Sequence, residues 1–198
     1  MVRNPAQLMS GPRTFDPVVV GNHETDAWVA YYRHDWIKFL RSSVGMVAAG
    51  FGMSRARTLA GAWYVLKANQ LWAPFPDNQP DGARAYMRRF YELVADSEDF
   101  DPAKAARLEV EWWRIHRAHQ HDSAVTREQL EDALVELYSY VYKADKESVR
   151  PAAAHRVDAM DCSDRWVAAG CNLDDRLLVE ERRALVASYA ALRLAVSD

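Results

Sequence analysis

Residues 101–121, DPAKAARLEVEWWRIHRAHQH, carry the clearest helix signals in the chain. Asp101 is a typical N-cap residue, and Pro102 follows it at the first helical position, where proline is favoured. Apolar side chains then recur every three or four residues, at Leu108, Trp112 and Ile115. This spacing places them on one face, so the segment is predicted to be an amphipathic helix with a buried side.

The same pattern extends along the chain on both sides of this segment. Six further stretches with apolar residues at helical spacing begin near Thr25, Ser54, Ala83, Thr126, Pro151 and either Asp174 or Asp175. No stretch alternates strictly between apolar and polar residues, as a half-buried strand would. The connections are short, which favours antiparallel neighbours. We therefore predict an all-α fold, a single compact bundle of about seven helices that are mostly antiparallel, with no sheet.

The chain of 198 residues suits one domain with its own hydrophobic core. Residues 1–22 are rich in proline, glycine, asparagine and arginine, and they are predicted to form an irregular N-terminal arm. Residues 23–198 are predicted to form the helical-bundle domain.

Composition and charge exclude several classes of protein. The net charge is −3 and no basic stripe is visible, so we expect no nucleic-acid partner. No run approaches the ~18 apolar residues of a membrane span, and no secretory signal is visible, so we expect no membrane association. The two cysteines, Cys162 and Cys171, suit a reduced compartment. We expect a cytoplasmic protein, and the excess of arginine over lysine suggests a bacterial origin.

Aromatic residues are abundant, with seven tryptophans and nine tyrosines. Large rings dominate core packing and also line ligand pockets. The sequence therefore predicts an aromatic-lined pocket for a small apolar or aromatic molecule.

Four polar residues on two predicted helices suggest a metal site. Glu109 and His116 are seven residues apart, about two helical turns, and therefore share a face. His155 and Asp158 lie three residues apart on a later helix. Together they would make a mixed nitrogen and oxygen ligand set suited to iron or manganese.

Simpler interpretations of the same residues stay open. A buried histidine and glutamate are also satisfied by arginine and tyrosine partners, and the Glu-x-x-His motif of di-iron bundles is absent. The histidines at 116, 119 and 121 sit at a predicted helix C-terminus, where the helix dipole favours cations without any metal. The aspartates at 158, 161 and 164 step around a helix and are typical of a solvated face.

Tyr31 and His34 are the candidates for acid–base catalysis. They lie three residues apart, which places both on one face of a predicted helix. Two functions remain open at this point. One is a small helical enzyme with an aromatic-lined pocket, leaning towards a metal-dependent oxidoreductase that activates oxygen or water. The other is a non-enzymatic module that binds a small apolar ligand or a protein partner, and either could form a homodimer.

Overall fold

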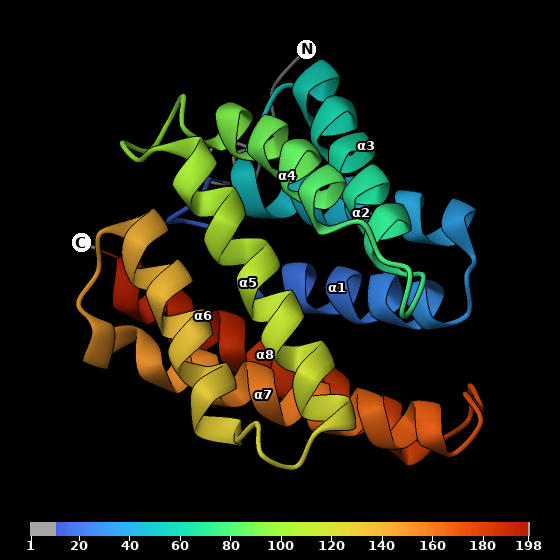
Figure 1. Cartoon of the computed structure of the whole chain (residues 1–198). Coiled ribbons are helices and arrows are strands. Elements are labelled where there is room, and N and C mark those ends of the chain that lie inside the picture. The colour runs from blue at the N-terminus through green and yellow to red at the C-terminus, as the bar shows by residue number, and fades with distance from the viewer. Residues whose placement is uncertain (1–10, 198) are drawn as a thin grey trace.

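The computed structural model describes residues 11–197, which fold into eight α-helices joined by short connections (Figure 1). They are α1 (Pro17–Tyr32), α2 (Trp36–Phe51), α3 (Arg55–Trp72), α4 (Pro80–Val94), α5 (Pro102–His121), α6 (Arg127–Tyr142), α7 (Lys146–Ala168) and α8 (Arg176–Val196). No strand is present among these residues. The predicted all-α fold is confirmed.

The extensive contacts between helices follow the order of the chain. Each helix packs against the one before it and the one after it, and α8 returns to pack against α1. Figure 1 shows α5, in yellow-green, between α4 and α6. The eight helices therefore close into a ring, and the side chains on their inner faces meet in the middle of the molecule.

The stretch from Thr25 onwards, predicted as one helix, is in fact shared between two helices, α1 and α2. The chain turns at His34, whose φ of 56° lies in the left-handed region. Asp35 then caps α2, because its side chain accepts a hydrogen bond from the backbone N–H of Lys38 at 3.1 Å. The turn changes the direction of the chain, and the apolar residues that recur every fourth position across it, from Trp28 to Val44, are half-buried against the core.

The predicted N-terminal arm, residues 1–22, is partly wrong. α1 begins at Pro17, and Asp16 caps it by accepting a hydrogen bond from the N–H of Val18 at 2.8 Å. Asp16–Pro17 is thus the same start signal as the one at residues 101–102. Residues 1–10 of the predicted arm lie outside the described part of the chain.

The core is built from the inner faces of the ring. Fully buried side chains include Val47, Leu130, Leu134, Met160, Trp166 and Leu185. Within residues 11–197, no helix combines the length and the apolar character needed to cross a membrane.

Candidate functional site

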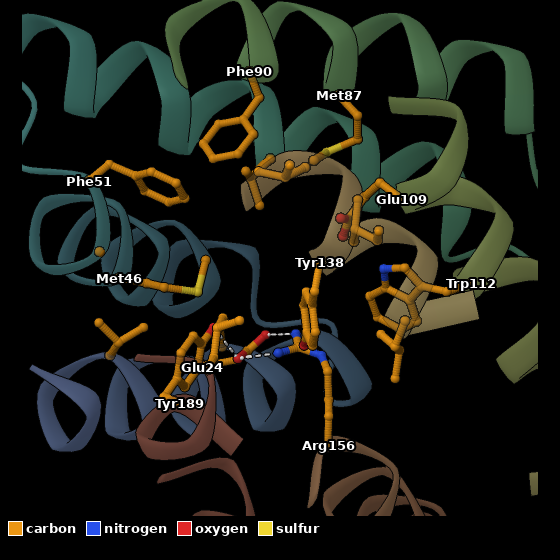
Figure 2. Close-up of a pocket in the computed structure, with 18 of the residues that line it drawn as sticks. Glu24, Met46, Phe51, Met87, Phe90, Glu109, Trp112, Tyr138, Arg156 and Tyr189 are labelled. Carbon is orange, nitrogen blue, oxygen red and sulfur yellow. Dashed lines mark hydrogen bonds and ion pairs between the residues drawn. The ribbon is translucent and has the colours of Figure 1, made fainter. Parts of the chain in front are cut away.

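The middle of the ring holds a cavity of about 200 Å³, to which all eight helices contribute side chains (Figure 2). Most of the wall is apolar or aromatic; it includes Met46, Phe51, Met87, Phe90, Leu134 and Leu137. Three charged residues, Glu24, Glu109 and Arg156, interrupt this wall. A mainly apolar cavity with a few polar groups is the usual form of a small-molecule site.

Arg156 of α7 and Glu24 of α1 form an ion pair at the cavity. Nη1 of Arg156 donates to Oε2 of Glu24 at 3.2 Å, and Nη2 donates to Oε1 (dashed in Figure 2). The hydroxyl of Tyr189 also donates to Oε2 of Glu24, at 2.6 Å. Burial alone would lower the pKa of Arg156, but the Glu24 carboxylate and the nearby phenol groups raise that pKa well above its usual value. Arg156 is therefore a permanent buried cation.

Aromatic rings enclose this guanidinium. Its central carbon lies 5.6 Å from the ring centroid of Trp28, 5.5 Å from that of Trp112 and 6.0 Å from that of Tyr189. Cation–π attraction strengthens when such a pair is shielded from water. The rings and the ion pair together fix the position of Arg156 in the cavity wall.

Glu109 of α5 is the second carboxyl group of the wall. Its Oε2 accepts a hydrogen bond from the hydroxyl of Tyr91 at 2.7 Å, and its Oε1 accepts one from the indole N–H of Trp113 at 3.1 Å. Burial raises the pKa of Glu109, while the hydrogen bond from Tyr91 and the charge of Arg156 oppose that rise. A carboxyl group with a raised pKa beside a cavity is a candidate proton donor or acceptor.

A second cavity of about 80 Å³ adjoins the first. The two share part of their walls, namely Trp28, Phe39, Asn69, Trp112 and Trp113. The remaining wall of the second cavity is more polar; it includes Tyr31, Tyr32, His116, Arg117 and Gln120.

Hydrogen bonds tie these polar groups together. Asp164 accepts from Gln120 at 2.6 Å and lies 3.1 Å from Nε2 of His116. Arg117 donates to the hydroxyl of Tyr31 at 3.2 Å. Burial raises the pKa of Tyr31, with Arg117 acting in the opposite direction. The second cavity thus has a paired polar rim beside the apolar main cavity.

The residues predicted to act in catalysis or metal binding occupy three places. Tyr31 and His116 meet at the second cavity, whereas Glu109 lines the central one. His34 is exposed and stacks on Trp36. The imidazole of His155 is 46 % exposed on the outside of the ring, 3.5 Å from Asp158, which also pairs with Arg127 at 2.7 Å.

The iron or manganese centre stays a prediction. No group of three or more His, Cys, Asp or Glu side chains within residues 11–197 is placed to hold a metal ion. Elemental analysis of tag-free protein tests the prediction. Stoichiometric iron or manganese that is lost on His116→Ala supports it. A protein that stays metal-free after anaerobic reconstitution with either metal removes it.

The sequence interpretation missed Glu24 and Arg156. One signal was available for Arg156, because it lies four residues after Ala152 and four before Met160, on the buried face of α7. A charged residue at a core-facing position needs a buried partner. The sequence offers no comparable signal that Glu24, 132 residues away, is that partner.

Comparison with known proteins finds no relative: no family model, no curated protein and no solved structure matches the chain. Any proposal for function therefore rests on the cavity itself.

Proposed function

We propose that the central cavity binds a small, mainly apolar or aromatic molecule. One observation carries the proposal, namely a cavity of about 200 Å³ at the centre of the ring with a largely aromatic wall. An apolar cavity of about 150 Å³ is large enough to bind benzene. The volume here therefore suits a molecule of one or two rings.

The energetics of packing support occupancy by a ligand. Protein interiors are close-packed, so the side chains around a cavity of this size lack contacts that a filled site would give them. A ligand that fills it recovers the lost contacts with rings such as Phe90 and Trp112. Charged groups in the wall would then orient the ligand.

Binding of indole, measured by titration calorimetry, tests the proposal. We expect Val65→Phe to weaken binding by at least about 10-fold, because Val65 lines the cavity and a phenyl ring there occupies the ligand's space. Val179→Phe is the matched control, since Val179 is 48 % exposed and lies outside the cavity wall. The proposal fails if neither indole nor any other one- or two-ring arene binds the wild-type protein. It also fails if the two variants bind equally well.

An enzyme that acts on this molecule is the second candidate function. Glu109 favours it, because a buried carboxyl group with a raised pKa beside a ligand cavity is suited to general acid–base chemistry. Mass spectrometry of bound ligand after incubation with the wild-type protein and with Glu109→Gln tests this candidate. Unchanged ligand in both samples counts against it. The cytoplasmic location, the bacterial origin and the homodimer stay predictions.

A further inference from the structure

We infer that the ligand carries a neutral carbonyl oxygen, which accepts hydrogen bonds from the indole N–H of Trp112 and from Nε of Arg156. This inference rests on the proposed function, because it names the polar group of the molecule that fills the central cavity.

Two unpaired donors in the cavity wall support it. Nε1 of Trp112 and Nε of Arg156 are buried, and within residues 11–197 neither has a hydrogen-bond partner. Both residues are only 8 % exposed, and both line the central cavity. Buried donors are normally paired, and leaving one unpaired costs free energy. Two such donors in one cavity wall indicate that an acceptor belongs there.

The neighbouring groups are already engaged elsewhere. Both terminal nitrogens of Arg156 donate to Glu24, and Nε is its one nitrogen that has no hydrogen-bond partner within residues 11–197. Trp113, next in the chain to Trp112, donates its indole N–H to Glu109. Figure 2 shows Trp112 with its nitrogen on the edge of the ring that faces Tyr138 and Glu109. No side chain within residues 11–197 accepts a hydrogen bond from Trp112, and a ligand in the cavity that Trp112 lines can supply the acceptor.

The charges of the wall select the kind of acceptor. Arg156 is balanced by Glu24, so a ligand carboxylate would lie beside the carboxyl group of Glu109 with no free cation to pair with it. An ammonium group would suit Glu109, but it has no lone pair for Trp112 or Arg156. A ketone, aldehyde or amide oxygen has two lone pairs and no charge, so it can accept from both donors. The inferred ligand is therefore a neutral arene bearing a carbonyl group.

A pair of isosteric probes tests the inference. Acetophenone and α-methylstyrene have nearly the same shape and differ in a C=O against a C=CH₂ group. We expect acetophenone to bind the wild-type protein about 5- to 10-fold more tightly in titration calorimetry. We expect Trp112→Phe to reduce this ratio by about 5-fold, because phenylalanine keeps an aromatic ring and removes the N–H donor. Trp28→Phe is the matched control: it also trims a cavity ring but leaves both unpaired donors in place, so the ratio stays at its wild-type value.

The outcomes separate this inference from the proposed function. Equal affinities of the two probes for the wild-type protein overturn the inference and leave the apolar cavity site standing, and this comparison needs no variant to fold. A ratio unchanged in Trp112→Phe, or tighter binding of 2-phenylethylamine than of acetophenone, also overturns the inference. If none of the probes binds, and indole does not bind either, the proposed function itself fails.

Discussion

Replacing Arg156 by methionine is expected to lower the free energy of unfolding by about 3–5 kcal/mol, the range found when one partner of a buried ion pair is removed. The side chains of Arg156 and Glu24 are only 10 % and 7 % exposed. Without the guanidinium, the Glu24 carboxylate stays buried and keeps its hydrogen bond from the hydroxyl of Tyr189. Urea unfolding followed by circular dichroism measures the change.

Two further variants make this result specific. Adding Glu24→Gln to Arg156→Met removes the orphaned charge, so we expect the double variant to unfold at a higher urea concentration than the single one. Arg182→Met is the matched control. Arg182 of α8 also pairs with an acidic residue of α1, Asp26, but this pair lies at the surface, with side chains 39 % and 53 % exposed. Its expected loss is within about 1 kcal/mol. Equal losses for Arg156→Met and Arg182→Met would contradict the importance of the buried pair.

Replacing Glu181 by glutamine is expected to stabilise the protein at neutral pH. Glu181 is fully buried between α8 and α7, where burial raises its pKa to about 8, although the hydrogen bond from Ser163 at 2.8 Å opposes that rise. Its Oε1 has no hydrogen-bond partner within residues 11–197. A neutral amide avoids the cost of a buried acid that ionises in the unfolded chain.

The sign of the pH dependence follows from linkage. Below a pH of about 4.5 the carboxyl group is protonated in both the folded and the unfolded states, so the charge carries no penalty there. Between about 4.5 and 8 only the unfolded state ionises, and the stability of the wild-type protein falls as the pH rises. The gain from Glu181→Gln is therefore small near pH 4.5 and on the order of 3 kcal/mol at pH 7.

Glu180→Gln serves as the control for this prediction. Glu180 is adjacent in the chain but pairs with Arg176 at the surface, where the arginine side chain is 88 % exposed. We expect no comparable gain in stability and no comparable pH dependence for this variant. If thermal unfolding shows the same gain for Glu181→Gln at pH 4.5 and at pH 7.5, the raised pKa of Glu181 is not the cause.

The sequence predicted the start of a helix correctly where a few neighbouring residues encode that start. The Asp101–Pro102 start is present at the expected position, and the helix predicted to begin near Thr126 does so with a capping box between Thr126 and Gln129. The break at His34 was missed, because a left-handed residue other than glycine leaves no mark in an apolar repeat. The start of α7 at Lys146, capped by Asp145, was also missed, since Pro151 looked like a first-turn proline.

The sequence predicted the aromatic nature of the pocket, but it did not predict most of the polar residues in its wall. The abundance of tryptophan and tyrosine indicated an aromatic-lined pocket, and Glu109 lies in its wall. The pairing of Glu24 with Arg156 depends on α1 and α7 meeting across the ring, which no local pattern contains. Likewise, His155 and Asp158 share a face as predicted, but that face lies on the outside of the ring, where Asp158 pairs with Arg127.

A crystal structure of the protein soaked in bromobenzene tests most directly whether the cavity is a ligand site. The anomalous signal of bromine locates the bound molecule without any assumption about its orientation. We expect one strong bromine peak inside the central cavity, among side chains such as Phe90, Leu134 and Trp112. A cavity filled by ordered water or by rearranged side chains, with bromine found only on the surface, would contradict the proposed function.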